Sequence, residues 1–489
     1  MIKEMKQIPV TKESHPFASA MFHCRLEELG YVEDEYFMSG TANVYREAEE
    51  RKPEQIYSDA PYTTRLLVRR PGNIEAFSGN VVIEVLNASA MMDIDRMWVN
   101  SWKYFTRNGD IYIGITSKGH VVDALKKFDP ERYEPINWDN PMPERKTPPQ
   151  TGPFPFLSQY ESGLFWDMLV DLAKLLRTDS DLNPIASYKK ACGKAWLYLT
   201  GWSQSGGYVT RIVNSFAYLP ENCAEAPLFD GYLAAGCGAD MAPMNAYDGA
   251  ARFGRSGIPK GSVMGAREPY ININTESENR HVNWVGDSDQ PGFLFRTYQI
   301  PGSSHDSAYN LLEYYEGQGA EDNLRFGMVL RFNGESGEPM DYPYEPIFCA
   351  AFRNLYLWVR EGIPAPHAPR IETELVGPGE SDDPFGAWIK NRTDAFGNAK
   401  GGIRFPAIDY PTARYQSYSR SAEGRVDAMF GTAYPLSPEV LRGLYKSLEQ
   451  YRTLVEQSAR ECVKRGFLLE EDLEACVEDL VGKAAQRGL

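Results

Sequence analysis

Several features that would define other classes of protein are missing from this sequence of 489 residues. It has no uninterrupted apolar run of about 18 residues, the length that a transmembrane helix needs, and no apolar stretch follows the N-terminus to form a signal peptide. The seven cysteines are scattered and include no C-x-x-C pair, which argues against a disulfide framework and against a zinc site. We expect a cytoplasmic protein with free thiols and no contact with a membrane.

Positive charge is also in short supply. Lysine and arginine total 51 against 67 acidic residues, which gives a formal net charge of −16, and no basic tract occurs. Such a surface repels phosphate backbones, so nucleic acid is not an expected partner. The content of 43% apolar and 24% charged residues is ordinary for a globular chain.

Strand and helix patterns alternate along much of the chain. Residues 79–86, which are rich in β-branched residues, and residues 111–116 have patterns typical of buried strands, and residues 96–107 between them have a helical pattern. Another apolar run at 195–200 leads into a helix expected from 204 to 216. This alternation predicts an α/β fold, with a mostly parallel sheet flanked by helices. Further strands are expected at 231–235, 269–274 and 295–300, and further helices at 158–177, 345–361 and 436–488.

No convincing linker divides the chain, so we expect residues 1–489 to form a single large domain. Residues 236–267 are rich in Gly, Ala and Met and could cap a site within that domain. Residues 364–489 are expected to form a C-terminal extension, which packs on the core.

The strongest chemical signal is a turn between a strand and a helix, with the sequence Gly201-Trp202-Ser203-Gln204-Ser205-Gly206-Gly207. A sharp turn in this context is typical of a nucleophile elbow, G-x-S-x-G, which exposes a serine hydroxyl above the sheet. Ser203 is the favoured nucleophile because Gly201 ends the strand and Gln204 begins the helix; Ser205 then takes the place of the last glycine. A frame shifted by two residues would make Ser205 the nucleophile instead.

A serine nucleophile of this kind needs a histidine and an acid later in the chain. Of the six histidines, only His281, His305 and His367 follow the serine. His305 is the favoured base because it lies in a turn, Pro301–Asp306, directly after a predicted strand, where catalytic loops gather. His281 sits in a charged run, and His367 sits in a proline-rich loop.

The acid is expected directly after the strand at 269–274, in Thr275-Glu276-Ser277-Glu278. A spacing like that of G-x-x-D puts Glu278 at the acid position, and Glu276, two residues away, is a rival. Either carboxylate could fix the imidazole tautomer and stabilise the imidazolium ion.

Backbone amides are the expected oxyanion donors. The N–H of Gln204 opens a helix, and a second donor, Ala88 or Ser89, is expected in the loop that follows the strand at 81–86. Trp202, beside the nucleophile, could line the substrate pocket or only buttress the elbow.

Together these residues predict hydrolysis of a small-molecule carboxylic ester through an acyl-enzyme, without a metal or organic cofactor. An acyltransferase or an amidase could use the same triad. A rival from another class is a catalytically inactive hydrolase fold that acts as a binding protein. The sequence names neither the substrate nor the oligomeric state.

Several segments spread over nearly the whole chain share the pattern of one known family: Gly30–Phe37, Val81–Ser89, Gly201–Gly207, Thr275–Glu278, Pro301–His305, Gly401–Arg414 and Gly466–Leu469. In these segments the sequence resembles the bacterial alpha/beta hydrolase domain-containing proteins. The resemblance implies an α/β-hydrolase core with a C-terminal extension, a serine nucleophile in G-x-S-Q-S-G at Ser203, and a histidine in G-x-x-H at His305. The family's T-E-x-D segment commonly ends in Asp where this chain has Glu278, a departure that strengthens Glu276 as the alternative acid. The segment Gly401–Arg414 is expected to pack the extension against the core.

Overall fold

The computed structural model describes most of the chain, namely residues 1–17, 24–49, 51–145, 159–238, 241–246, 262–263, 265–281, 285–310, 332, 334–377 and 389–489. The chain divides into two compact units. The first unit comprises Met1–Tyr270, Asn283–Leu294 and Leu312–Leu330, and the second comprises Ile271–Val282, Phe295–Leu311 and Arg331–Leu489. The single domain proposed for residues 1–489 stays a prediction, and most of the cap predicted at 236–267 lies outside the described residues.

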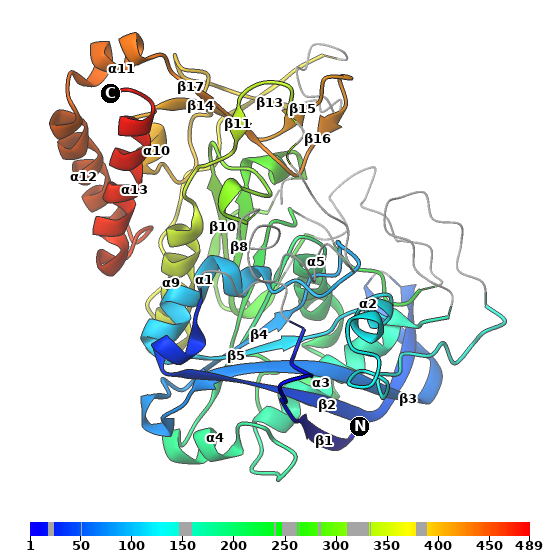
Figure 1. Ribbon diagram of the computed structural model, residues 1–489. Coiled ribbons are helices and arrows are strands. Elements are labelled where there is room, and N and C mark those ends of the chain that lie inside the picture. The colour runs from blue at the N-terminus through cyan, green and yellow to red at the C-terminus, as the bar shows by residue number, and fades with distance from the viewer. Residues whose placement is uncertain are drawn as a thin grey trace. The chain divides into compact units, whose positions relative to one another are not determined.

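The first unit is built on a sheet whose central strands are parallel (Figure 1). These strands follow the order β5-β4-β6-β7. Strands β2 and β3 form a long antiparallel hairpin, with β1 on the outer side of β2 and β5 beside β3. The strands are β1 (Ile2–Ile8), β2 (Tyr31–Glu49), β3 (Lys52–Pro71), β4 (Asn80–Val85), β5 (Ile111–Ile115), β6 (Trp196–Trp202) and β7 (Gly231–Ala235).

Helices connect the parallel strands of this unit. Strands β4, β5 and β7 are buried along their whole length, as strands covered on both faces are. The predicted α/β fold is thereby confirmed. The helices are α1 (Arg96–Asn108), α2 (Val121–Phe128), α3 (Phe165–Leu176), α4 (Ala186–Cys192), α5 (Gln204–Arg211) and α6 (Pro220–Cys223).

Two local features differ from the sequence predictions. The helix expected over 204–216 is α-helical only as far as Arg211, and Ile212–Phe216 then forms a π-helical turn. The hairpin of β2 and β3 was not predicted at all, although β2 includes most of Gly30–Phe37, one of the segments that resemble the family. Its inward-facing residues include charged side chains, and these hid the strand pattern.

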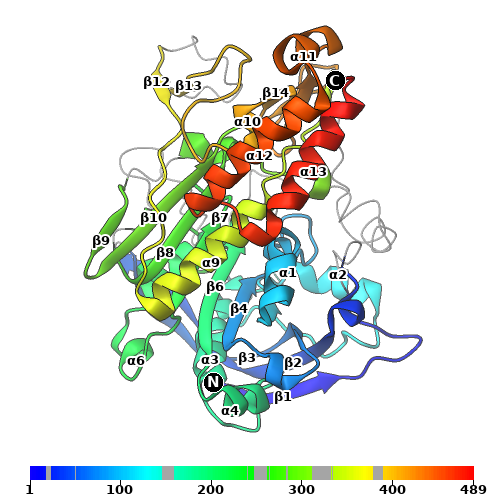
Figure 2. The ribbon, with the colours of Figure 1, turned by 90° about the vertical axis from the view of Figure 1, so that its left-hand side faces the viewer.

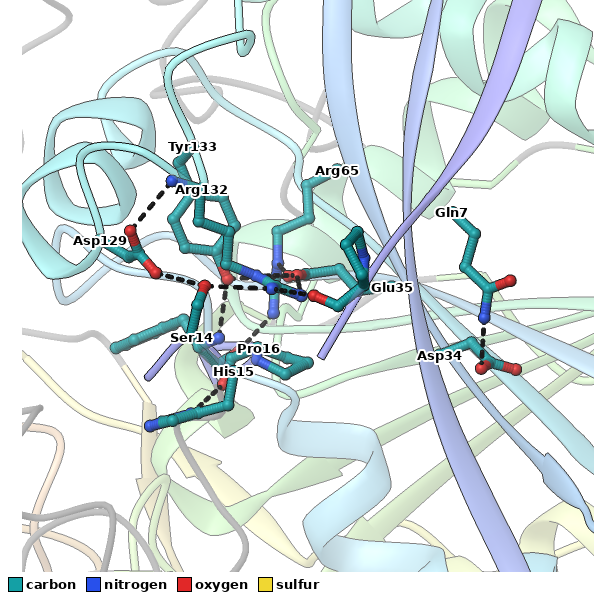
Figure 3. Close-up of polar contacts among 12 residues, drawn as sticks. Gln7, Ser14, His15, Pro16, Asp34, Glu35, Arg65, Asp129, Arg132 and Tyr133 are labelled. Atoms are coloured by element: carbon teal, nitrogen blue, oxygen red, sulfur yellow. Dashed lines mark hydrogen bonds and ion pairs between the residues drawn. The ribbon is translucent and has the colours of Figure 1, made fainter. Parts of the chain in front are cut away.

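A buried group of charged side chains fixes this hairpin (Figure 3). Arg65 on β3 pairs with Glu35 on β2 and, at 3.1 Å, with Asp93 in the loop after β4. The same Glu35 carboxylate accepts hydrogen bonds from Arg132 at 2.7 Å and from the Tyr133 hydroxyl at 2.8 Å. Because each of these charges is paired, their burial is tolerated, and the pairing ties the loop that contains Asp93 to the hairpin.

A second buried carboxylate, Glu84 on β4, leads to a prediction about stability. It accepts hydrogen bonds from the N–H groups of Met97 and Trp98, in the first turn of α1, and from the Tyr112 hydroxyl, at 2.9, 3.0 and 2.7 Å. Burial raises the pKa of Glu84 from 4.5 to about 8, although these hydrogen bonds act in the opposite direction. The folded protein therefore keeps the proton of Glu84 between pH 4.5 and about 8, whereas the unfolded chain has lost it.

Since the folded state binds the extra proton, the contribution of Glu84 to stability falls as pH rises through that window, at up to about 1.4 kcal/mol per pH unit. We expect Glu84→Gln, which cannot ionise, to remove this component. Urea unfolding of both proteins from pH 5 to 8 measures it, and two parallel stability curves would contradict the raised pKa.

The second unit contains the C-terminal parts of two neighbouring strands, β8 (Ala266–Thr275) and β10 (Phe293–Ile300). The predicted helix at 345–361 is α9 (Glu345–Glu361). The helical stretch predicted at 436–488 is divided into α11 (Pro438–Tyr445), α12 (Leu448–Lys464) and α13 (Glu470–Gln486), of which α12 and α13 lie side by side (Figure 2). The remaining elements of this unit are β11 (Glu338–Pro339), β12 (Thr373–Leu375), β13 (Ile389–Asn391), α10 (Pro406–Asp409), β14 (Ala413–Gln416), β15 (Ser419–Arg420), β16 (Val426–Asp427) and β17 (Thr432–Pro435). The short strand β9 (Ser288–Gln290) belongs to the first unit.

Within the described part of the chain, no helix is both long enough and apolar enough to cross a membrane.

Candidate active site

Ser203 occupies the turn between β6 and α5 in a conformation that amino acids with a side chain rarely adopt. Its backbone angles are φ 58° and ψ −123°. Such a conformation costs on the order of 1–3 kcal/mol and persists only where the surroundings enforce it. Here the Ser203 N–H donates to the Ala235 carbonyl at 2.8 Å, and the Gly207 N–H donates to the Ser203 carbonyl at 3.3 Å. The turn thus has the backbone strain of a nucleophile elbow.

The glycines around Ser203 are required by close contacts. A Cβ on Gly201 would lie 2.5 Å from the Ser205 carbonyl oxygen, and a Cβ on Gly206 would lie 2.8 Å from the Cys237 side chain. Any larger residue at either position would push the turn open. The spacing of small residues in the motif therefore follows from the sharpness of the turn.

The two candidate serines differ in what their hydroxyls do. Ser205 is 2% exposed, and its Oγ donates to the Trp202 carbonyl at 2.8 Å and accepts from the Trp202 N–H at 3.1 Å. The half-buried Ser203 hydroxyl forms no hydrogen bond within the described residues of the first unit. Ser203 rather than Ser205 therefore has the geometry of an available nucleophile.

Trp202 ends β6, directly before Ser203, and is 3% exposed. Its ring lies 4.8 Å from the guanidinium of Arg96, and a Cβ on Gly236 would lie 2.9 Å from the same ring. These contacts favour the buttress over the pocket wall that the sequence also allowed.

Both predicted oxyanion regions belong to the first unit. The Gln204 N–H is the first amide of α5, where helical amides have no partner within the helix. In the loop after β4, the Ser89 N–H already donates to the side chain of Asn87, at 2.7 Å. Of the two amides predicted in this loop, that of Ala88 is therefore the better candidate.

His305 and Glu278 meet in the second unit. The His305 Nδ1 lies 2.6 Å from the Glu278 Oε1, and both residues are buried. Because a carboxylate can only accept, the proton lies on Nδ1 and Nε2 is left as the basic nitrogen. Burial alone would raise the pKa of Glu278, but the charge of His305 and the hydrogen bonds from His305 and Thr275 outweigh it, so this pKa lies below its usual value. This carboxylate is therefore ionised at neutral pH.

The position of Glu278 follows from a local motif. The Glu278 Oε2 accepts from the Thr275 N–H at 2.8 Å and from the Thr275 hydroxyl at 2.6 Å. Thr275 precedes a 3₁₀ turn, Glu276–His281, and the Glu278 side chain reaches back to the Thr275 N–H, which is one half of a capping box. One Glu278 oxygen caps the turn, and the other is left for the histidine.

Glu276, the rival acid, holds the backbone of the histidine turn instead. One of its oxygens accepts from the Gly302 N–H at 2.7 Å, and the other accepts from the Asn391 side chain at 3.0 Å. Burial raises the pKa of Glu276, although these two hydrogen bonds counteract it.

The segment Gly401–Arg414 packs on the same histidine turn. The Ile403 N–H donates to the Gln299 carbonyl at 2.8 Å, and a Cβ on Gly402 would lie 2.7 Å from that same oxygen. A Cβ on Gly302 would lie 2.5 Å from Ile408. The extension thereby supports the turn that carries His305.

Sequence reasoning did not single out Asn87 or Asn391. Asn87 had a readable signal, because an asparagine at the end of a strand often bonds the amide two residues further on. Asn391 had none, since its partner Glu276 lies far away in the sequence.

The parallel sheet, the strained serine turn at a strand end and the buried histidine–carboxylate pair define the class of α/β-hydrolases. The chain belongs to the family described as Alpha/beta hydrolase domain, whose model matches residues 4–478. The predicted membership of an alpha/beta hydrolase family is thereby confirmed.

Solved structures of other hydrolases resemble the chain weakly. An arylesterase is 10% identical and covers 54% of this chain and 82% of its own, with a TM-score of 0.30. A glucuronoyl esterase from Solibacter usitatus is 9% identical, with coverages of 60% and 82% and a TM-score of 0.27. A siderophore hydrolase from Aspergillus nidulans is 17% identical, with coverages of 46% and 69% and a TM-score of 0.23. A search of curated protein sequences found no match. At such TM-scores these likenesses carry no argument about the reaction.

Proposed function

We propose that the protein is a serine esterase, which hydrolyses a carboxylic ester through an acyl-enzyme. Ser203 is the nucleophile, His305 the general base and Glu278 the acid that orients His305. Gln204 and Ala88 supply the amides that hold the oxyanion. No metal or organic cofactor enters the reaction.

The mechanism has two symmetrical halves. In the first, the Ser203 Oγ forms a bond to the ester carbonyl carbon while its proton passes to the His305 Nε2. The bond between the carbonyl carbon and the alkoxy oxygen of the ester then breaks, and His305 gives the proton to the departing alcohol. In the second half, water takes the place of the serine hydroxyl, and its attack releases the acid and restores Ser203.

The observation that carries the proposal is the strained backbone of Ser203, at φ 58° and ψ −123°. Strain of this kind costs stability and gives nothing to packing, so it is expected mainly where a function depends on it. The helix that begins at Gln204 adds a partial positive charge beside the turn, which favours a developing oxyanion.

The pair of His305 and Glu278 supports the same reaction. An ionised carboxylate at 2.6 Å from Nδ1 fixes the tautomer in which Nε2 accepts a proton, and it stabilises the imidazolium ion that follows. Ser203 belongs to the first unit and the pair belongs to the second, so the transfer from the Ser203 Oγ to the His305 Nε2 is itself part of the proposal.

Labelling with a fluorophosphonate tests the proposal. The Ser203 Oγ should displace fluoride and form a bond to phosphorus, so intact mass should rise by one adduct and peptide mapping should assign it to Ser203. Hydrolysis of p-nitrophenyl acetate should stop as the adduct forms. A folded protein that takes up no adduct would overturn the proposal and favour a binding protein, whereas an adduct on Ser205 would move the elbow by two residues.

A further inference from the structure

The loop after β4 is fixed at its start by backbone hydrogen bonds. The Asn87 N–H donates to the Ile94 carbonyl at 2.9 Å, and the Ile94 N–H donates to the Asn87 carbonyl at 2.8 Å. In a trans peptide the carbonyl and the following N–H point in opposite directions. The Ala88 N–H therefore points away from Ile94, and within the described residues it has no hydrogen-bond partner.

The next peptide of this loop is held on both sides. The Ala88 carbonyl accepts from the His120 Nε2 at 3.0 Å, and the Ser89 N–H donates to the Asn87 Oδ1 at 2.7 Å. Since a carbonyl needs a donor, His120 carries its proton on Nε2. Burial lowers the pKa of His120 to about 4, so the ring is neutral near pH 7. The Ala88 N–H thus belongs to a peptide whose carbonyl is held by Ile94, and the peptide that follows is held by His120 and Asn87.

The other end of the Asn87 side chain reaches the elbow. Its Nδ2 donates to the Trp202 carbonyl at 2.8 Å, and the residue is 3% exposed. A carbonyl can only accept and an N–H can only donate, so these two partners leave a single orientation for the side-chain amide. Asn87 therefore joins the loop that contains Ala88 to the residue directly before Ser203.

We infer that Asn87 is a positioning residue, which fixes the Ala88 amide relative to the elbow amide of Gln204 so that both can bind one oxyanion. The inference rests on the proposed function. Preorganised donors stabilise a transition state because no reorganisation is needed when the charge develops. Loss of the two Asn87 side-chain hydrogen bonds should therefore slow the chemical step and leave the binding of the neutral ester almost unchanged.

Two substitutions test the inference. Asn87→Ala removes both side-chain hydrogen bonds, and Asn87→Asp keeps the acceptor for Ser89 but opposes a carboxylate oxygen to the Trp202 carbonyl. We expect each variant to lower kcat for p-nitrophenyl acetate by about 10- to 100-fold with little change in KM. Inhibition by an alkyl trifluoromethyl ketone should weaken by the same factor, because its adduct with Ser203 carries the oxyanion.

Asn80→Ala is the matched control. Asn80 lies at the opposite end of β4, is 1% exposed, and donates through its side chain to Asp110 at 3.0 Å. It should lose stability as Asn87→Ala does while it keeps the kcat and the ketone affinity of the wild type. A merely structural role for Asn87 would make the two alanine variants behave alike.

The outcomes separate the inference from the proposed function. Wild-type labelling by fluorophosphonate together with wild-type kcat in a folded Asn87→Asp or Asn87→Ala protein would overturn the inference alone. A loss confined to KM would also overturn it. A wild-type protein that resists labelling would overturn the proposed function, and this inference with it.

Discussion

Ser203→Ala is expected to lower kcat/KM for p-nitrophenyl acetate by at least about 10,000-fold and to abolish labelling by a fluorophosphonate. In the proposed mechanism the Ser203 hydroxyl forms the acyl-enzyme, and residual catalysis would come from the oxyanion donors alone. Ser205→Ala is the matched control, because it removes a hydroxyl two residues away that bonds only the Trp202 backbone. It should cost about 1 kcal/mol of stability and keep its labelling at Ser203. The opposite pattern in the two variants would make Ser205 the nucleophile.

The strain at Ser203 gives a second readout that does not depend on activity. Alanine and glycine both remove the hydroxyl, but only glycine accepts φ 58° without a Cβ penalty. In an ordinary strand or helix, glycine is less stable than alanine by about 0.5–1 kcal/mol. Here we expect Ser203→Gly to be more stable than Ser203→Ala by about 1 kcal/mol, measured by urea unfolding. If Ser203→Ala were the more stable of the two, the backbone of the turn would not be strained.

The parts of the fold that could be predicted include strands that are buried throughout and rich in apolar residues. Strands β4, β5 and β7 are buried throughout, so their apolar runs were readable without any knowledge of neighbours. The hairpin of β2 and β3 was not readable, because it buries Glu35, Arg65 and Arg69 in ion pairs. Some of these pairs join the two strands, and others reach partners elsewhere in the chain. A charged residue reads as solvent-exposed until its partner is known.

The candidate site likewise has a part that could be predicted from local sequence and a part that depends on distant residues. The elbow could be predicted because its conformation demands small residues at fixed spacing, and Gly201 and Gly206 meet that demand. The choice between Glu276 and Glu278 could not be made, because both follow the same strand end. That choice depends on the hydrogen bonds from Thr275 to Glu278 within the turn, and on Gly302 and Asn391, which bond Glu276 and lie further along the chain.

Glu278→Gln is expected to lower kcat by about 1,000- to 10,000-fold, because the neutral side chain no longer fixes the tautomer or stabilises the imidazolium ion of His305. The pKa of Glu278 lies below its usual value, so this contribution is present at neutral pH and is lost as pH falls through the folded-state pKa. In the wild type, kcat should therefore fall at low pH, in part because Glu278 becomes protonated. In Glu278→Gln, that part of the fall should be absent.

Glu276→Gln is the matched control for this prediction. It changes the same chemical group two residues away, where the carboxylate holds the Gly302 N–H and the Asn391 side chain and does not touch His305. A glutamine oxygen can still accept from Gly302, so we expect at most about a 10-fold loss of kcat, through small displacements of the histidine turn. Steady-state kinetics of the two variants from pH 5 to 9 decide between them. A larger loss in Glu276→Gln than in Glu278→Gln would reverse the assignment of the acid, and it would mean that the turn rearranges when substrate binds.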